Sequence, residues 1–230
     1  MNIEQLRNNY PWPEEKPNVP QDPHGWFSDE VKTTALKNQI DSSTGIIVEL
    51  GSWLGMSTRL MLEAAPNAAV ISIDHWQGSI EHKDNPKIME KLPTLYETFL
   101  VNCWEYRERL IPIRSSSNDG LKVVYDSGIR PDLILIDADH TYEGVLFDLV
   151  LSDLLFPTSL LVGDDYGWTP IKKKRKKKKE LFSTRLKNNL LGQKEAEELP
   201  YLPVRDAVNY FAKQKKYSVE NHGNLWIIRK

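Results

Sequence analysis

Short apolar runs alternate along the chain with longer amphipathic segments. Runs of this length, bounded by polar or turn residues, are typical of buried strands. They predict five strands, at residues 46–50, 70–73, 111–113, 133–136 and 160–162. The segments between them predict helices at about 54–65, 91–110, 118–125 and 142–155. An earlier helix is expected in DEVKTTALKNQI, with Ser28 as its N-cap.

The C-terminal region predicts a helix at 204–214 and two further strands at 217–220 and 225–229. The tetrapeptide Asn221-His222-Gly223-Asn224 between the strands has the composition of a hairpin turn. Strands that alternate with helices indicate a parallel sheet covered on both faces. We therefore expect an α/β fold with a doubly wound, mostly parallel, seven-stranded sheet and an antiparallel C-terminal hairpin at one edge.

The chain has 230 residues, which predicts one domain. Residues 10–27 hold five prolines and two tryptophans, so residues 1–27 are expected to form an extended N-terminal arm. The domain would then span residues 28–230. Its alternating pattern is interrupted at about 169–202, which predicts an insertion on the ligand-binding side of the sheet.

Charge is distributed unevenly. The net charge is −2, but residues 172–179 read KKKRKKKK; without these eight cations, 22 basic residues face 32 acidic ones, a balance of −10. No stretch reaches the roughly 18 apolar residues of a membrane span, and the N-terminus lacks the pattern of a signal peptide. The single cysteine, Cys103, excludes internal disulfides and cysteine zinc sites. We expect a cytoplasmic protein with no membrane partner.

The first strand leads into VELGSWLGMST at residues 48–58, where glycines allow a ligand to approach the backbone. The following helix N-terminus favours an anion. The spacing of Gly51 and Gly55 differs from the G-x-G-x-x-G of a NAD site. Glu49 would sit badly beside a pyrophosphate, and it suits a cofactor that carries positive charge.

The second strand ends in SIDHWQG, with Asp74 at its tip. An acid at this position typically binds ribose hydroxyls, and Trp76 could stack on a flat base. Together the two motifs describe a nucleoside with a cationic, amino-acid-like tail, which is S-adenosylmethionine. The same motifs contribute four further candidate cofactor-binding residues: Ser52, Trp53, Ser57 and His75.

Two later strands both end in paired carboxylates. LILIDADHTYEG, residues 133–144, places Asp137, Asp139 and His140 after the fourth strand. LLVGDDYGW, residues 160–168, places Asp164 and Asp165 after the fifth. We expect the acids at these two strand ends to form a single site.

With these four motifs the chain resembles the class I S-adenosylmethionine-dependent methyltransferases. Among them it is similar to the metal-dependent small-molecule O-methyltransferases that include the macrolide-sugar and novobiocin-sugar enzymes. The resemblance covers about residues 24–168 and 203–230, and the lysine-rich insertion departs from it. It implies a Rossmann-like methyltransferase fold, metal ligands at Asp137, Asp164 and Asp165, and a general base at Asp139. It also adds three residues to the candidate cofactor site: Ser115, Ser116 and Asp137.

Electrostatics supports a cation at this position. Adjacent parallel strands lie about 4.8 Å apart, so the four aspartates at the two strand ends would repel one another. Either some are protonated or a cation sits among them. Oxygen ligands favour Mg²⁺, with Mn²⁺ or Ca²⁺ as alternatives. His140 is a second candidate catalytic residue, for which a substrate or supporting role is favoured over ligation. The alternative is a purely structural role, in which these aspartates only cap the following helices.

The predicted activity is methyl transfer to a hydroxyl of a small molecule, such as a sugar or glycoside. The rival is a nucleic-acid methyltransferase or nucleic-acid-binding protein that uses KKKRKKKK. It is less favoured because no aromatic residue is interleaved with the lysines. A cofactor-binding protein without catalysis is disfavoured because the four acids are intact. A homo-oligomer that exchanges the arm between subunits is left open.

Overall fold

A computed structural model describes residues 2–79, 82, 85–169 and 202–230. The predicted insertion, with its lysine run, lies outside the described residues apart from its two ends. The strands in the described residues are β1 (Ile46–Leu50), β2 (Ala69–Asp74), β3 (Leu110–Arg114), β4 (Leu133–Ile136), β5 (Leu160–Gly163), β6 (Ser218–His222) and β7 (Leu225–Arg229). The α-helices are α1 (Ile3–Asn9), α2 (Glu30–Lys37), α3 (Met56–Ala64), α4 (Pro86–Met89), α5 (Leu95–Asn102), α6 (Ser117–Asp126), α7 (Tyr142–Leu155) and α9 (Pro203–Lys215), and the short 3-10 helices are η2 (Leu92–Thr94) and η3 (Trp104–Tyr106).

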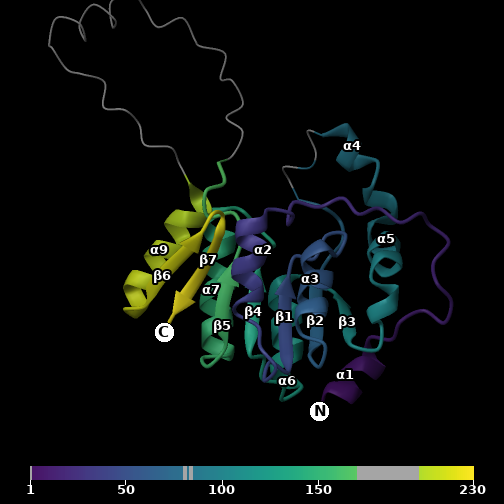
Figure 1. Cartoon of the computed structure of the whole chain (residues 1–230), viewed down its shortest axis with the longest axis horizontal. Helices are drawn as coiled ribbons and strands as arrows, with labels where there is room; N and C mark the ends of the chain where they lie inside the picture. The colour runs from purple at the N-terminus through teal and green to yellow at the C-terminus, as the bar shows by residue number, and fades with distance from the viewer. Residues whose placement is uncertain (1, 80–81, 83–84, 170–201) are drawn as a thin grey trace, which may run out of the picture.

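The strands form one sheet in the order β3-β2-β1-β4-β5-β7-β6 (Figure 1). The first five strands in this order are parallel, and β7 pairs antiparallel with both β5 and β6. The predicted seven-stranded sheet with an antiparallel C-terminal hairpin is confirmed. Connections leave β1 and β4 in opposite directions, which makes the boundary between these two strands the switch point where α/β sheets bind ligands.

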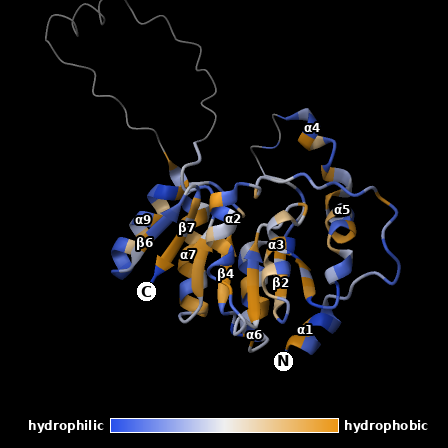
Figure 2. Ribbon diagram, in the orientation of Figure 1, coloured by the Kyte–Doolittle hydropathy of each residue, from blue (hydrophilic) through white to orange (hydrophobic). Residues whose placement is uncertain are grey.

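Two apolar layers cover the sheet, as the alternation of side chains along β1 illustrates. Val48 and Leu50 face the layer formed with α6, α7 and α9, whereas Ile47 faces the layer formed with α2, α3 and α5. The central strands are almost wholly apolar because both of their faces are covered (Figure 2). None of the described helices is long and apolar enough to cross a membrane.

The predicted long helix at 91–110 is wrong. The structure divides this segment into η2, α5, η3 and the first residue of β3. Pro93 lies within η2, and proline both lacks a donor N–H and restricts the residue before it, which interrupts helical hydrogen bonding. A smaller difference concerns α2, whose N-cap is Asp29, one residue after the predicted Ser28.

The N-terminal segment begins with a helix, α1, that the sequence did not predict. Hydrogen bonds fasten the rest of the arm to the domain at Trp12, at Asp22, which also pairs with Lys91, and at His24, which accepts from the Trp53 indole. The indole of Trp12 donates to the carbonyl of Leu110 (2.8 Å). The Asn102 side chain accepts from the Asp22 amide (3.1 Å) and donates to the Asp22 carbonyl (2.7 Å). The arm then crosses above the C-terminal ends of the strands (Figure 1), which brings Trp26 over the site described next.

Candidate active site

A cavity of about 1260 Å³ opens at the C-terminal ends of β1, β2, β4 and β5. Drug-sized ligands typically occupy pockets of about 300–1000 Å³, so this cavity can hold a cofactor together with a second molecule. Its wall includes the turn after β1, the tips of β2 and β4, and the first turns of α6 and α7. The two predicted motif pairs therefore share one cavity.

The turn after β1 is shaped by glycine. Gly51 and Gly55 have φ angles of 81° and 82°, a region that side chains with a Cβ rarely adopt. An added Cβ on Gly51 would lie 2.2 Å from the carbonyl oxygen of Asp137. The turn thus packs directly on the end of β4, and it presents Ser52, Trp53 and Ser57 to the cavity.

Glu49 does not reach the cavity, contrary to the prediction that it contacts the cofactor. Its side chain is fully buried and lies on the α3 side of the sheet. Its carboxyl group accepts hydrogen bonds from the hydroxyls of Ser52, Ser57, Thr58 and Ser72 at 2.5–2.9 Å. Burial raises the pKa of Glu49 and these four donors oppose the shift. Glu49 therefore acts on the site indirectly, by holding the turn and α3 in place.

Asp74 lines the cavity at the tip of β2, as predicted. Its Oδ2 accepts from the amides of Ser52 and Trp53, both at 2.9 Å, and its Oδ1 accepts from the amide of Trp76 at 2.6 Å. His75 is exposed and also lines the cavity. Asp74 therefore ties the β1 turn to the β2 turn and presents the same carboxylate to the cavity.

Trp76 is placed differently from the prediction. It is 2% exposed and packs against Tyr96 and Phe99 in the core, with ring centroids at 4.7 and 4.8 Å. Its indole N–H donates to the carbonyl of Trp53 (2.9 Å). Trp76 supports the turn from below and is not available to stack on a base in the cavity.

The aromatic surface of the cavity comes from other residues. Trp26 of the arm lies beside Trp53 (ring centroids 5.5 Å apart) and stacks on His82 (5.7 Å, interplanar angle 11°). Trp26 is 53% exposed even with these partners. Its position on the cavity wall suits Trp26 to cover a bound ligand.

Ser115 and Ser116 line the cavity beyond β3, as predicted. Three residues that the sequence did not single out lie with them: Ser117, Asn118 and Asp148. Asp148 is 4% exposed and comes from α7. Burial, together with the nearby charge of Asp139, raises the pKa of Asp148 to about 7. In the sequence, the signal for Asp148 is an acidic residue within a mostly apolar helix.

The raised pKa of Asp148 predicts a pH-dependent stability. Between about pH 4 and pH 7 the folded state keeps a proton that the unfolded state has lost, so stability should fall as pH rises through this window. Asp148→Asn should remove this residue's share of the fall and raise the unfolding free energy at pH 8 by about 1–4 kcal/mol, with little change near pH 4. Urea unfolding at several pH values measures this. The exposed Asp126→Asn is the matched control, and equal pH profiles for the two variants would contradict the assignment.

Asp137, His140 and Asp165 form a compact cluster in the cavity. His140 Nε2 lies 2.9 Å from Asp165 Oδ2 and 3.6 Å from Asp137 Oδ1. One potential ligand atom from each residue lies within 4.8 Å of the other two. Burial raises the pKa of Asp137, as do the charges of Asp164 and Asp165. This is the mutual repulsion that the sequence predicted for acids at neighbouring strand ends.

Asp164 lines the cavity as predicted but lies outside this cluster. It is 4% exposed, and its Oδ2 is bound by the ammonium group of Lys32 from α2. The next residue, Asp165, has a φ of 62° and lies against His140 instead. The structure thus brings Asp137 and Asp165 together as predicted, but His140 joins them where Asp164 was expected.

Asp139 lines the cavity beside this cluster. It is exposed, and its Oδ1 accepts from the amide of Thr141 (2.7 Å), the N-cap of α7. Its carboxyl group lies against Gly144, where an added Cβ would come within 2.4 Å of Asp139 Oδ2. Asp139 therefore stabilises the start of α7 and is also accessible to a ligand in the cavity.

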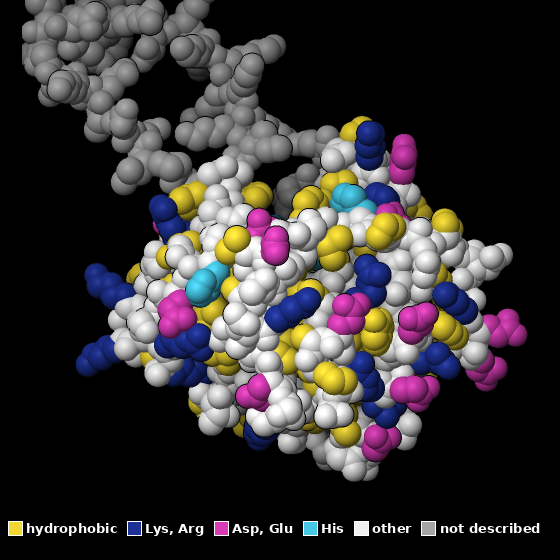
Figure 3. Space-filling model, viewed as in Figure 1, with side chains coloured by type: hydrophobic (Ala, Val, Ile, Leu, Met, Phe, Trp, Pro, Cys, Tyr) yellow, Lys and Arg dark blue, Asp and Glu magenta, His cyan; other side chains and the backbone are white. Residues whose placement is uncertain are grey.

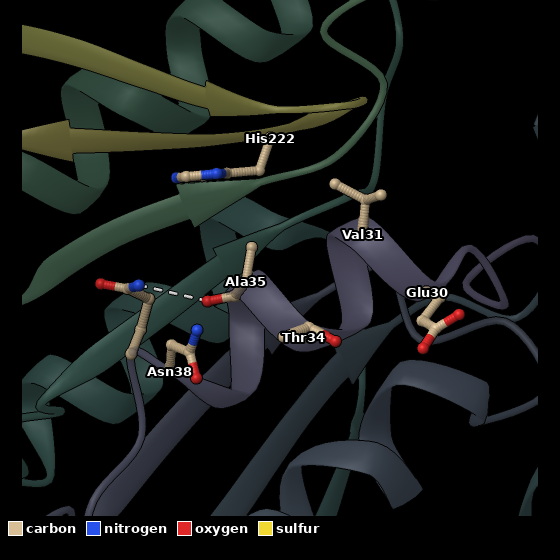
Figure 4. A pocket seen from close by; sticks show the side chains of 7 residues that line it. Glu30, Val31, Thr34, Ala35, Asn38 and His222 are labelled. Carbon is tan, nitrogen blue, oxygen red and sulfur yellow. Dashed lines mark hydrogen bonds between the residues drawn. The ribbon is translucent and has the colours of Figure 1, made fainter.

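A second, smaller pocket of about 400 Å³ lies on the outer face of α2, against the β6–β7 hairpin (Figure 4). Val31, Thr34 and Ala35 of α2 line it together with His222 of β6. Val31 and Ala35 are its aliphatic residues, and Glu30 and His222 are its only titratable ones. We assign the chemistry to the large cavity.

Comparisons with known proteins identify the family and the fold of the chain. A family model described as a methyltransferase domain matches residues 48–166. No curated protein matches the chain.

Two solved structures are similar in fold. One is a "putative caffeoyl-CoA O-methyltransferase" from Staphylococcus aureus, with 16% identity and a TM-score of 0.54 over 100% of this chain and 93% of that one. The other is the O-methyltransferase TomG from Streptomyces achromogenes in complex with S-adenosylmethionine, with 11% identity and a TM-score of 0.50 over 86% of this chain and 78% of that one.

Proposed function

We propose that this chain, which belongs to the methyltransferase domain family, transfers a methyl group from S-adenosylmethionine to a hydroxyl of a small molecule. The acceptor class that we expect is a sugar or glycoside. The observation that carries the proposal is the single cavity that joins the glycine turn and Asp74 to the cluster of Asp137, His140 and Asp165. Cofactor and acceptor can therefore meet within it.

A divalent cation fits the cluster. Two carboxylates and an imidazole offer converging ligand atoms, and the neighbouring acids need positive charge to coexist in ionised form. Asp137, His140 and Asp165 would hold the ion, which we expect to be Mg²⁺ or another divalent cation; Mn²⁺ accepts both oxygen and imidazole ligands. Bound there, such an ion would lower the pKa of a coordinated hydroxyl and so make it a better nucleophile.

Residues of the chain itself would supply the general base, position the cofactor and cover the cavity. Asp139 is exposed to the cavity and would accept the proton of the acceptor hydroxyl. The turn at Gly51 would fix the cofactor so that its methyl group faces the β4 end, where geometry contributes much of the rate. Trp26 and Phe27 of the arm line the cavity and would exclude water from it.

Asp74 provides the test of cofactor binding. Asp74→Ala removes the acceptor for three backbone amides and the carboxylate for a ribose, so S-adenosylhomocysteine should bind at least about tenfold more weakly. Isothermal titration calorimetry measures the change in affinity, and circular dichroism verifies that the variant is folded. Unchanged affinity in a folded Asp74→Ala variant, or tight binding of NAD in place of S-adenosylhomocysteine, would refute this part of the proposal.

The acceptor can be sought by incubating the protein with methyl-labelled S-adenosylmethionine, Mg²⁺ and a panel of hydroxylated sugars, glycosides and catechol-like compounds. RNA and DNA belong in the same panel, because the lysine run suggested nucleic acid as an alternative. That run lies outside the described residues. On the face shown in Figure 3, Lys and Arg are interspersed with Asp and Glu, so this surface does not favour a phosphate backbone.

A further inference from the structure

Lys32 is a buried cation at the edge of the proposed active site. The residue is 5% exposed, although lysine is rarely buried without a charged partner. Its ammonium group bonds to Asp164 Oδ2 and lies 4.6 Å from the ring centroid of Phe27. Neither the sequence motifs nor the proposed mechanism gives Lys32 a role. Its helix, α2, presents Val31 and Thr34 to the outer pocket of Figure 4, whereas Lys32 does not line that pocket and is buried against Asp164.

Asp164 is held firmly by its surroundings. Its amide donates to the carbonyl of Ile136 (3.3 Å), and its carbonyl accepts from the indole of Trp226 (2.9 Å). Its second carboxyl oxygen, Oδ1, is buried and has no hydrogen-bond partner in the described residues. The backbone then turns through the left-handed conformation at Asp165, and this side chain reaches His140. Two consecutive aspartates are thereby directed to two different side chains, Asp164 to Lys32 and Asp165 to His140.

We infer that Lys32 is a resident counter-cation for Asp164, which keeps this carboxylate out of the metal-ligand set and leaves the adjacent Asp165 to meet His140. The inference rests on the proposed function and deepens it. With one carboxylate neutralised internally, the site needs a single divalent ion for Asp137 and Asp165, and it takes His140 as the third ligand. Lys32 is a positioning residue, since it lies outside the cavity wall.

Mn²⁺ binding to the cofactor-free protein, followed by calorimetry, tests the ligand set. Lys32→Met would leave a buried carboxylate unpaired beside the site, so Mn²⁺ should bind about tenfold more tightly. The double variant Lys32→Met/Asp164→Asn removes both charges and should match the wild type within about threefold. Lys37→Met, an exposed lysine on the same helix, is the control and should change nothing. Loss of Mn²⁺ affinity in the double variant would show that Asp164 is a ligand and would overturn the inference.

Thermal unfolding of the metal-free proteins provides an independent readout. Each single variant, Lys32→Met or Asp164→Asn, should lower the melting temperature, and the double variant should recover most of the loss because no buried charge is left unpaired. Absence of recovery in a double variant that folds would count against the pairing. If the wild type binds no Mn²⁺, the proposed metal dependence is refuted. The inference about Lys32 then predicts that Lys32→Met creates a Mn²⁺ site, and a variant that still binds no Mn²⁺ would overturn the inference.

Discussion

Asp165→Asn should abolish binding of the divalent ion and lower methyl transfer by about 10³-fold or more. A bound cation contributes several kcal/mol of charge stabilisation, and each 1.4 kcal/mol corresponds to about a factor of ten in rate. Asp165 is one of the three residues whose ligand atoms converge, and its Oδ2 lies 2.9 Å from His140 Nε2. Asn keeps the shape of the side chain but halves its ligand oxygens and removes its charge. Mn²⁺ calorimetry and a turnover assay with any acceptor from the screen measure the two effects.

A matched variant separates ligation from proton transfer. Asp139→Asn should keep both Mn²⁺ and S-adenosylhomocysteine affinity and lose about 10²–10⁴-fold in turnover, the usual range for a general base. In the absence of metal, Asp165→Asn should be at least as stable as the wild type, because removing one charge relieves the repulsion that raises the pKa of Asp137. Methyl transfer that continues undiminished in excess EDTA would refute the ion site and leave these acids as caps or bases.

Much of the fold could be predicted from the sequence because its strands are local and strongly apolar. The bounds of β1, β4 and β7 agree with the predicted 46–50, 133–136 and 225–229. Runs that are buried on both faces have a signal that depends little on their neighbours. The segment at 91–110 failed because its amphipathic pattern continues through Pro93 and Cys103, although the backbone hydrogen bonding is interrupted at both.

The site was predicted by position more accurately than by side-chain direction. Strand ends fix where a residue lies, so Asp74, Asp137, Asp139 and Asp165 all line the cavity as expected. Direction depends on partners elsewhere in the chain. Glu49 turns toward hydroxyls of α3 and β2, and Trp76 turns into a pocket formed by α5. In both cases a polar or aromatic motif residue supports the turn from behind.

The pairing of Asp164 with Lys32 was beyond the reach of local patterns. Lys32 lies 132 residues before Asp164 and looks like one of several lysines on an amphipathic helix. Its burial becomes apparent only when α2 packs against α3 and the β6–β7 hairpin and brings Lys32 to Asp164. Likewise Trp26 belongs to a proline-rich arm whose course is set by Asn102 and Trp12. These are tertiary contacts between residues far apart in the sequence, and local residue patterns do not predict them.

Gly51→Ala should be strongly disruptive, because the added methyl group combines an unfavourable backbone conformation with a clash against the end of β4. The φ of 81° costs a non-glycine residue about 1–2 kcal/mol. The new Cβ would also lie 2.2 Å from the carbonyl oxygen of Asp137 and 2.6 Å from the Cα of Ala138, and overpacking of this kind costs about 1–3 kcal/mol. We expect a loss of about 2–5 kcal/mol in unfolding free energy by urea titration.

Relief of that clash must separate the β1 turn from the end of β4, so Gly51→Ala should lose affinity for both S-adenosylhomocysteine and Mn²⁺, although it removes no ligand of either. Gly45→Ala is the matched control. Gly45 precedes β1, its added Cβ would meet its nearest neighbour, Asp132 Oδ2, at an ordinary 3.6 Å, and its φ lies outside the left-handed region. This control should stay within about 1 kcal/mol of the wild type and keep both affinities. If a folded Gly51→Ala variant bound one ligand normally and lost only the other, the two halves of the cavity would be independent. The direct contact between Gly51 and Asp137 would then not couple cofactor binding to the carboxylate cluster.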